Sequence, residues 1–513
     1  MSRIKLTPFA KILIFIVIIG VVGGGLYKTG KIQNLIATKS GNTDKLYKEV
    51  GTIHKESGTM NISLDEWLGW KPIIDANGGL TTKSGSIYDK LGLKLNISVI
   101  NDGSQSSNAL IKGDLNGAGY TVNRYAFLYP KFKDNNIATK MVYVTNSSSG
   151  GDGIIAKKGI NRIEDLVGKK IAVPRYSEAQ TLVEWLMSKS SLTPDQISKI
   201  RDNMVFTDSP DDCAKAFFAG KVDAAATWQP YISQAMTTAG THVLFSTKDA
   251  TNIILDGIVF RKDYLDSNKE QVSKFIEGAL KASSLYNTDM TSMKNTFPMY
   301  TTSTDEDIKG SLGDATIANV KTNVDDLNND DGVARELFSN MSDIWKSIGE
   351  KSNRADTSDA FDDSFVKELV SKFPDSQEQT VKITDKEKTT AQTQDNNKAL
   401  LTKRLSINFE TNSSAISPDS YSSLSDFANT AKILNGTVIQ IEGNTDNTGD
   451  NTINKPLSAK RAQAVAIYLQ SQGVDSSRFI VVGNGSDKPL GSNDTDAGKE
   501  QNRRTDMYFK TVK

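Results

Sequence analysis

The chain has 513 residues, too many for a single hydrophobic core, which indicates about three or four separately folding units. Its 61 lysines and arginines equal its 61 aspartates and glutamates, so there is no basic field to attract nucleic acid. One cysteine and two histidines, without a CxxC motif or paired histidine spacing, exclude an intramolecular disulfide and provide no zinc site, Cys/His dyad or cofactor site.

The first candidate element is an apolar segment near the N-terminus. Sixteen uncharged residues, Ile12 to Tyr27, are dominated by Ile, Val, Leu, Phe and Gly. As a helix they measure about 24 Å, slightly less than the ~30 Å hydrocarbon core, and flanking lysines can snorkel at both ends. A single transmembrane helix within residues 1–30 is therefore predicted. Its tip is cytoplasmic because more basic residues precede it than follow it: Arg3, Lys5 and Lys11 against Lys28 and Lys31.

A cleaved signal peptide is the alternative to a retained helix. Signal peptides usually have a shorter apolar region, about 7–15 residues, followed by a small-residue cleavage site. The run Val22-Gly-Gly-Gly contains small residues but no Ala-x-Ala site, and no cysteine follows it for a lipid anchor. We favour a retained membrane anchor. It places everything beyond about residue 30 outside the cytoplasm and makes residues 31–58 a linker.

Residues 59–374 alternate short strand-like runs with helical stretches. The strand-like runs are residues 96–100, 141–144, 153–156, 170–173 and 224–227. Such alternation predicts an α/β fold with helices on both faces of a sheet, and about 310 residues are enough for two lobes.

Several segments of this region resemble the extracytoplasmic solute-binding proteins of ABC importers, in the branch that binds sulfonates, nitrate, taurine and pyrimidine precursors. The resembling segments are Trp67-Leu-Gly-Trp70, Asp102-Gly-Ser-Gln-Ser-Ser-Asn-Ala-Leu110, Gly151-Asp-Gly-Ile-Ile-Ala156, residues 163–173, and residues 217–226 ending in Trp228-Gln-Pro230. Their order and spacing imply a two-lobed periplasmic-binding-protein-like domain that captures a small-molecule solute. An ABC importer permease is a candidate partner. The resemblance does not define the solute.

Serines at expected helix starts are candidate solute ligands. Hydroxyls and free amides at a helix N-terminus bind anions readily, which makes an anionic solute one option. The alternative is that these serines only cap their helices. The residues are Ser104, Ser106, Ser107 and Ser177.

Tryptophans and aspartates complete the candidate solute site. Trp67, Trp70 and Trp228 can stack on a solute as cleft walls, although a tryptophan is by default a core residue, and we favour the cleft for Trp228. Asp152 and Asp256 can meet a cationic group, but Asp-Gly at both positions is also common turn chemistry.

Residues 375–399 are polar, charged and almost free of aromatic side chains. Such a stretch cannot bury enough apolar surface to offset the chain entropy lost on folding. It is therefore predicted to be a flexible linker, which fully stretched spans roughly 80 Å.

Residues 400–513 contain an acid and a base in a suggestive arrangement. Asp446 lies in the Gly-bounded turn Gly443-Asn-Thr-Asp-Asn-Thr-Gly449 after a strand-like run, and Arg461 follows on an amphipathic helix. A ligand with an ammonium and a carboxylate on one carbon, such as diaminopimelate in cell-wall peptides, matches such a pair. Without further knowledge, an ordinary salt bridge is the alternative.

The surrounding residues closely resemble the OmpA-like peptidoglycan-associating domain. The resembling motifs are Ile407-Asn-Phe-Glu-Thr-Asn-Ser-Ser414, Glu442 to Gly449, Asn454 with Leu457-Ser-x-x-Arg461-Ala, Tyr468-Leu-x-x-x-Gly473-Val, and Gly483-x-Gly485 leading to Asn502-Arg-Arg504. The resemblance implies a small α/β domain in which Asp446 and Arg461 grip diaminopimelate, supported by Asn454, Arg503 and Arg504. Asn444 departs from the usual histidine of the family.

The sequence therefore predicts a membrane-anchored, non-enzymatic solute-binding protein that attaches to peptidoglycan. A structural membrane-to-wall tether with a vestigial solute domain is the alternative. A flagellar stator is disfavoured because residues 1–43 contain no Asp or Glu to carry protons. An enzyme related to pyrimidine-precursor synthases is disfavoured because their cysteine-rich motif is missing. Cys213, at helical spacing with Phe217, is predicted to be a core thiol.

Overall fold

The computed structural model describes residues 46, 48–285, 289–301, 303–330, 332–351, 355, 357–377, 379, 381–409 and 413–512. Within these ranges no helix is both long and apolar enough to cross a bilayer. The predicted transmembrane segment, residues 12–27, lies outside the described residues, as does most of the predicted first linker.

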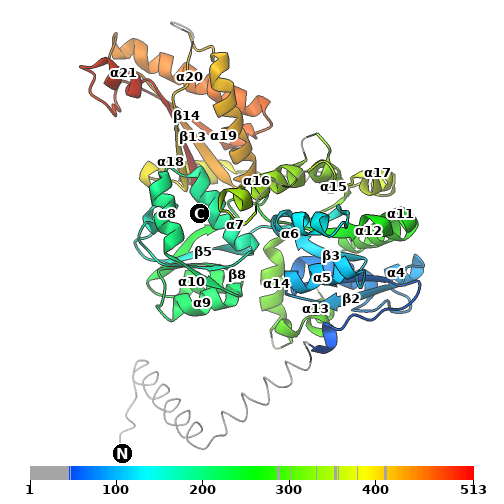
Figure 1. Ribbon diagram of the computed structural model, residues 1–513. Coiled ribbons are helices and arrows are strands. Elements are labelled where there is room, and N and C mark those ends of the chain that lie inside the picture. The colour runs from blue at the N-terminus through cyan, green and yellow to red at the C-terminus, as the bar shows by residue number, and fades with distance from the viewer. Residues whose placement is uncertain are drawn as a thin grey trace, which may run out of the picture.

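The first lobe is built on a six-stranded sheet in the order β11-β4-β10-β3-β1-β2. Its parallel strands β1, β2 and β3 and its antiparallel strands β4, β10 and β11 are covered by helices from two parts of the chain (Figure 1). The strands are β1 (Met60–Leu64), β2 (Leu95–Val99), β3 (Gly117–Thr121), β4 (Thr139–Ser148), β10 (Leu255–Arg261) and β11 (Ala315–Ile317). The helices are η1 (Leu68–Trp70), α3 (Lys71–Asn77), α4 (Ile87–Lys90), α5 (Gly103–Lys112), α6 (Val122–Asp134), α11 (Lys262–Ser267), α12 (Lys269–Ser284), α13 (Thr291–Thr296), η3 (Pro298–Tyr300), α14 (Asp305–Gly313), α15 (Val320–Leu327), α16 (Val333–Ser347), α17 (Ser364–Leu369) and η4 (Val370–Lys372).

The second lobe is built on a five-stranded sheet in the order β7-β6-β8-β5-β9. Its strands are β5 (Asp152–Lys157), β6 (Ile171–Pro174), β7 (Met204–Thr207), β8 (Ala224–Trp228) and β9 (Thr241–Ser246). Its helices are η2 (Ile163–Leu166), α7 (Glu178–Lys189), α8 (Pro194–Asp202), α9 (Pro210–Phe218) and α10 (Tyr231–Thr237). Cys213 is buried in this lobe, where burial raises the pKa of its thiol to about 12, so the predicted core thiol is confirmed.

Two short segments connect the lobes. The chain leaves the first sheet at the end of β4 and enters the second at β5, and it returns through residues 247–254 between β9 and β10. These two crossovers join two separately hydrogen-bonded sheets. The predicted α/β domain with two lobes is confirmed.

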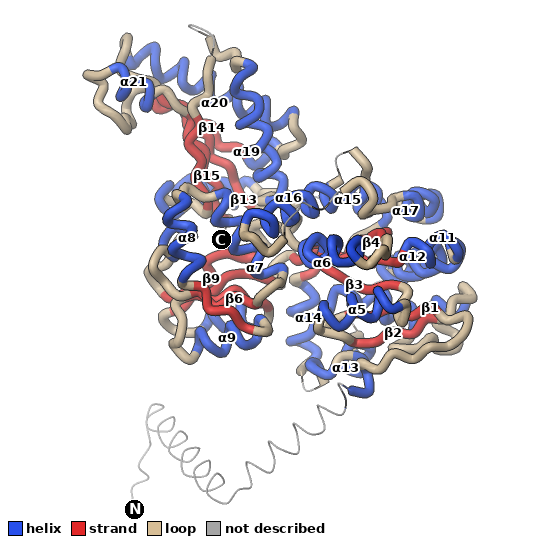
Figure 2. The backbone as a smooth tube through the Cα atoms, in the orientation of Figure 1, coloured by secondary structure: helices blue, strands red, loops and turns tan. Residues whose placement is uncertain are grey.

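The C-terminal domain is a four-stranded sheet in the order β12-β15-β13-β14 (Figure 2). Its strands are β12 (Leu401–Leu405), β13 (Thr437–Asn444), β14 (Phe479–Gly485) and β15 (Thr505–Thr511). Its helices are η6 (Pro418–Ser420), α19 (Tyr421–Ile433), α20 (Asn451–Ser471), η7 (Ser476–Arg478) and α21 (Asp496–Asn502). Apolar residues of α19 and α20 pack on one face of the sheet and form its core.

The predicted flexible linker is different in the structure. Gln377 and Gln379 hydrogen-bond to the first lobe, and residues 385–393 form helix α18 (Asp385–Thr393), followed by η5 (Asn396–Lys398). Ala391 and Ile383 are buried against Val438 and Ile480 on the second face of the C-terminal sheet. The composition of the segment did not predict this order, because a few apolar side chains are enough to hold a polar segment in place when they can pack on an uncovered sheet face.

The C-terminal domain is docked on the return crossover of the lobes. Asn435 exchanges two hydrogen bonds with Thr251, at 2.9 and 2.7 Å, and the Asn252 side chain donates to the Lys432 carbonyl. The Gly436 amide donates to the Asp249 carbonyl, and a Cβ at Gly436 would lie 2.0 Å from the Lys248 carbonyl oxygen. Only glycine allows this approach of the two backbones.

Replacing Gly436 by alanine is expected to undock the C-terminal domain without unfolding it, because the added Cβ overlaps backbone of the other domain. Small-angle scattering of the full chain measures the effect as an increased radius of gyration. Gly310→Ala is the matched control, since its Cβ would enter open space. Equal radii for Gly436→Ala and the parent chain would contradict this docking.

Candidate functional site

The turn after β13 presents Asp446 at the end of the C-terminal domain that lies far from the docking contact. Asp446 forms an ion pair with Arg503, with 2.7 Å between Oδ2 and Nη1, and accepts a hydrogen bond from the Thr448 amide at 2.9 Å. Burial alone would raise the pKa of Asp446, but these donors outweigh it and hold the pKa below its ordinary value. Asp446 is therefore an ionised carboxylate in a fixed orientation.

Arg461 lies near Asp446 but is not ion-paired with it. Its Nε donates to the Ser413 carbonyl at 3.1 Å, and its guanidinium carbon lies 4.9 Å from the centroid of the Phe409 ring. Burial lowers the pKa of Arg461, and the charge of Asp446 opposes that effect. Among the described residues, no carboxylate forms a salt bridge with Arg461. The predicted acid and base are neighbours, and Asp446 takes Arg503 as its partner.

Close packing of β13 against α20 fixes the distance between these groups. A Cβ at Gly443 would lie 2.2 Å from the Ser458 carbonyl, so glycine lets the strand touch the helix one turn before Arg461. Asn454, also on α20, is buried and donates to the Thr448 carbonyl at 3.1 Å, which ties the helix to the Asp446 turn. Asn454 therefore supports the site through the backbone of the Asp446 turn.

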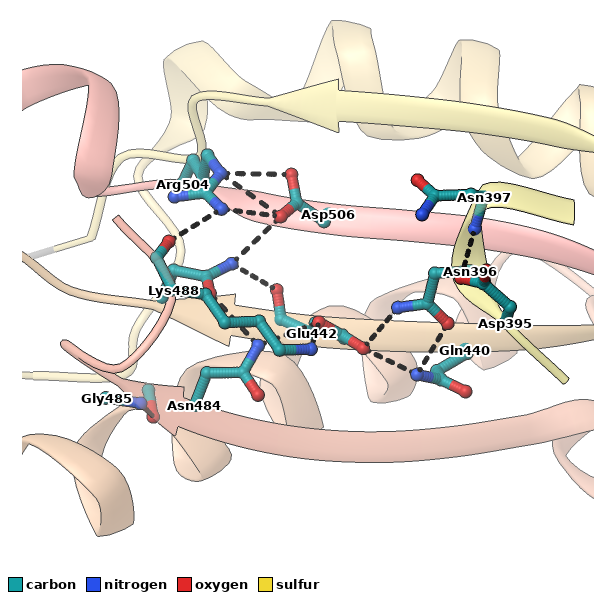
Figure 3. Close-up of polar contacts among 12 residues, drawn as sticks. Asp395, Asn396, Asn397, Gln440, Glu442, Asn484, Gly485, Lys488, Arg504 and Asp506 are labelled. Carbon is teal, nitrogen blue, oxygen red and sulfur yellow. Dashed lines mark hydrogen bonds and ion pairs between the residues drawn. The ribbon is translucent and has the colours of Figure 1, made fainter. Parts of the chain in front are cut away.

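The second face of the sheet holds a separate polar network centred on Glu442 (Figure 3). This carboxylate is 1% exposed and accepts hydrogen bonds from Asn396, Gln440, Asn484 and Lys488 at 2.5–2.8 Å. Burial would raise the pKa of Glu442, but hydrogen bonds from Lys488, Asn484 and Asn396 and the charge of Lys488 hold it below its ordinary value.

Arg504 belongs to this network and not to the Asp446 site. It forms an ion pair with Asp506 at 2.9 Å and donates to the Lys488 carbonyl. Arg503 ends helix α21 and reaches Asp446, whereas Arg504, the last residue before β15, reaches Asp506. Asn444, the departure from the family pattern, also faces the network and donates to Asp506 at 3.2 Å.

A second candidate site lies where the two lobes meet. Asp65, after β1, and Asp256, on β10, come from the first lobe, whereas Asp152, at the start of β5, and Glu178, at the start of α7, come from the second. These carboxylates interact electrostatically with one another. Arg124 on α6 is the cation among them, and its Nη2 forms an ion pair with Glu178 at 3.3 Å.

Burial raises the pKa of three aspartates at the junction, and neighbouring carboxylates add to the effect. Burial raises the pKa of Asp152 to about 7, and the neighbouring charge of Glu178 adds to the effect. Burial likewise raises the pKa of Asp65 and, with the charges of Asp65 and Asp152, raises that of Asp256 well above its ordinary value. Within the described residues no group of three His, Cys, Asp or Glu could hold a metal ion.

The predicted tryptophans have three different roles. Trp70 is fully buried and donates to Asp65 at 2.7 Å, so it is a core residue that orients the carboxylate. Trp67 donates to Asn146 at 2.9 Å, and its ring leaves no space for a Cβ at Gly151 in the outgoing crossover. Trp228 donates to Asp211 within the second lobe and pairs in the β5–β8 register with Asp152. Trp67 therefore contacts the first lobe and the outgoing crossover, whereas Trp228 hydrogen-bonds inside its own lobe.

The predicted serines are mainly structural. Asp102, not a serine, caps α5; Ser104 is exposed and Ser107 accepts a hydrogen bond from Lys131. Ser177 caps α7 through the Gln180 amide, as the alternative interpretation predicts. Of the four, Ser106 alone lines the small cavity beside Asp65 and Arg124, where its hydroxyl lies 2.9 Å from the Tyr120 hydroxyl.

Sequence reasoning missed Asp65, Arg124, Glu178 and Tyr120. Asp65 follows the carboxyl end of parallel strand β1, the edge where α/β folds bind ligands, and that position could have identified it. Arg124 and Glu178 have no local signal, because their meeting depends on how the lobes close. The lobes are in direct contact here: Asn123 donates to Thr181 across them at 3.0 Å, and Arg124 pairs with Glu178 across them. The cavity beside Asp65, about 10 Å³, is lined by the first lobe.

Two protein families match separate parts of the chain. Residues 82–287 match the NMT1/THI5 like family, and residues 408–503 match the OmpA family. The chain thus joins an NMT1/THI5-like domain to an OmpA domain.

Relatives of the OmpA domain include two curated proteins. One is the peptidoglycan-binding protein ArfA of Mycobacterium tuberculosis, 40% identical over 101 residues, which are 20% of this chain and 31% of ArfA. Another is the outer-membrane lipoprotein YfiB of Pseudomonas aeruginosa, 35% identical over 96 residues, which are 19% of this chain and 57% of YfiB. The chain therefore matches less than two thirds of the length of either protein.

The central domain is similar in structure to the periplasmic aliphatic sulphonate binding protein SsuA from Escherichia coli. The two share 16% sequence identity, the match covers 59% of this chain and 96% of SsuA, and the TM-score is 0.47.

Asp152→Asn is expected to stabilise the unliganded chain, by roughly 1–3 kcal/mol at pH 7.5. The folded pKa of about 7 lies above the ordinary 3.8, so the folded state binds more protons than the unfolded state between those values. Stability therefore falls as pH rises from about 4 to about 7, and the advantage of Asn grows over that range. Thermal unfolding from pH 4 to 8 measures it.

Asp223→Asn is the control for this measurement. Asp223 is a carboxylate of the same lobe in an ion pair with Lys157, and hydrogen bonding to that lysine lowers its pKa. Its replacement should not stabilise the chain. An Asp152→Asn variant that is less stable than the parent at pH 7.5 would refute the conclusion that the charge of Asp152 is uncompensated.

Proposed function

We propose that this chain is an extracytoplasmic solute-binding protein whose C-terminal domain attaches it non-covalently to peptidoglycan. Its NMT1/THI5-like domain binds a small molecule between its lobes, without catalysis, and a membrane helix at the N-terminus anchors it. Such a receptor would deliver its solute to the permease of an ABC importer, which is the proposed partner. The observation that carries the wall attachment is Arg461, a guanidinium beside Asp446 with no carboxylate of its own among the described residues.

The wall ligand on this proposal is the zwitterionic end of diaminopimelate. Asp446 is held ionised by Arg503 and Thr448, and a carboxylate has about four acceptor sites, so it can accept the ligand ammonium as a further donor. Arg461 supplies a fork for the ligand carboxylate, because its Nε bond to Ser413 fixes the plane of the guanidinium. Both ligand charges are then paired. A ligand that carries only a carboxylate or only an amine would leave either Asp446 or Arg461 without a charged partner.

The solute on this proposal is cationic, in contrast to the anionic option suggested by the serines. Four carboxylates and one arginine at the lobe junction leave an excess of negative charge when all are ionised. A buried carboxylate without a cation is costly, and a positively charged solute would remove that cost. Trp67 and Tyr120 add aromatic surface suited to an organic cation.

A structural tether with a vestigial solute domain is the second candidate function. The observation that favours it is that the two lobes already bind each other directly, through the Asn123–Thr181 hydrogen bond and the Arg124–Glu178 ion pair. A receptor must open its lobes and then hold a solute between them. Detection of any bound solute decides between receptor and tether.

Asp446→Ala and Arg461→Ala are each expected to weaken peptidoglycan binding by roughly tenfold or more, because each leaves one charge of the bound zwitterion unpaired. Co-sedimentation of the full chain with purified peptidoglycan containing diaminopimelate measures this loss. Lys460→Ala is the matched control, an exposed cation next to Arg461 on the same helix. Undiminished binding by both site variants would exclude the proposed wall site.

Cationic solutes are expected to raise the thermal stability of the chain more than anionic ones, and increasingly so as pH rises through about 7, where Asp152 loses its proton. The measurement is a thermal-shift series at pH 5.5, 7 and 8 with putrescine, choline and arginine against methanesulfonate, nitrate and phosphate. Asp256→Asn should reduce the response to the cation. A response to the anions alone would reverse the assignment of solute charge.

A further inference from the structure

A further cavity lies apart from both the lobe junction and the Asp446 site. It measures about 680 Å³, within the usual range of small-molecule sites. Its walls come from four parts of the chain that are distant in sequence: the crossover region of the lobes, helix α15, the linker and the C-terminal domain. The crossover region contributes Asn146 and Asn252, and helix α15 contributes Asp326. The linker contributes Lys382, and the C-terminal domain contributes Lys432.

Asp326 is the exceptional residue of this cavity. It is 8% exposed and lines the cavity, and within the described residues no hydrogen bond or ion pair reaches its carboxylate. Its neighbour Asp325 also lines the cavity but is more exposed and is paired with Lys321 at 2.7 Å. Buried carboxylates in folded proteins have partners, so an unpartnered one that faces a cavity indicates a missing donor.

Cations come from the walls that the linker and the C-terminal domain supply. Lys382 and Lys432 line the cavity, and no ion pair connects either of them to a carboxylate in the described part of the chain. Arg478, the third cation, is held by the carbonyls of Ala431, Leu434 and Thr437 and is therefore already satisfied. Within the described residues, the cavity is thus lined by a carboxylate without an ion-pair partner on one wall and by two lysines without one on other walls.

We propose that this cavity binds a small zwitterion of the α-amino acid class, with its ammonium at Asp326 and its carboxylate at Lys432 and Lys382. A ligand with one charge would satisfy one wall and leave the other unpaired, whereas an amino acid pairs both. Because the walls belong to both domains, the ligand would also strengthen the docking of the C-terminal domain on the crossover. This site is independent of the two binding sites proposed above.

The test is calorimetric titration of the full chain carrying Asp446→Ala, which removes the proposed wall site. Glycine, L-lysine and meso-diaminopimelate are the probes, with methylamine and acetate as the two halves of a zwitterion. At least one amino acid is expected to bind, and both halves should bind roughly tenfold or more weakly. Equal binding of either half, or no amino acid bound at millimolar concentration, would overturn the proposal.

Variants locate the bound amino acid. Asp326→Asn and Lys432→Met should each weaken binding by roughly tenfold or more, whereas Asp325→Asn, whose charge already belongs to Lys321, should retain most of it. Asp326→Asn removes an unpaired buried charge, so loss of folding is not expected to obscure the result. Binding that survives Asp326→Asn but is lost in Asp256→Asn would place the amino acid at the lobe junction and refute this site. That outcome would leave the solute-binding function intact.

Discussion

The approach of Gly436 to the backbone of Lys248 determines how the rest of the molecule is arranged. The loop before β13 touches the crossover that joins the two lobes, and a side chain at position 436 would prevent the contact. Since β13 starts at this contact and its eight residues rise roughly 3.3 Å each, Asp446 lies about 25 Å or more away, at the far end of the domain. The same contact closes one side of the interdomain cavity, where Lys432 and Asn435 meet the walls of the first lobe.

The buried carboxylates of the chain fall into two classes, one with a lowered pKa and one with a raised pKa. Glu442 is almost fully buried, and its hydrogen bonds with Lys488, Asn484 and Asn396 hold its pKa below the ordinary value. Asp152, Asp256 and Asp326 are also buried, but burial dominates and raises the pKa of each. The fold can therefore supply donors where a carboxylate serves the structure. Carboxylates without such a set of donors lie at the lobe junction or on a cavity wall, where a ligand can supply the positive charge.

The sequence predicted what local pattern and motif determine. Alternating strands and helices gave the two-lobed α/β domain, and the Gly-bounded turn gave Asp446 with Arg461 nearby. Contacts between distant segments were not predictable: the pairing of Asp446 with Arg503 depends on how β15 enters the sheet, and the Arg124 to Glu178 pair depends on lobe closure. The linker was misjudged because its helix α18 is stabilised by a sheet face elsewhere in the chain, which composition cannot reveal.

The placement of the wall site and the docking contact at opposite ends of β13 has a mechanical consequence. Load applied at Asp446 passes along a strand that is hydrogen-bonded on both sides, to β14 over residues 439–444 and to β15 over residues 437–443. The docking contact includes a few hydrogen bonds through Asn435, Gly436 and Asn252, each worth about 1 kcal/mol net, and an ion pair between Lys189 and Asp426 at 3.1 Å that adds about as much. The weaker element yields first, so the C-terminal domain should leave the crossover while its sheet stays intact. The ordered linker, held by separate contacts on the first lobe and on the C-terminal sheet, is then the next segment to take up the extension.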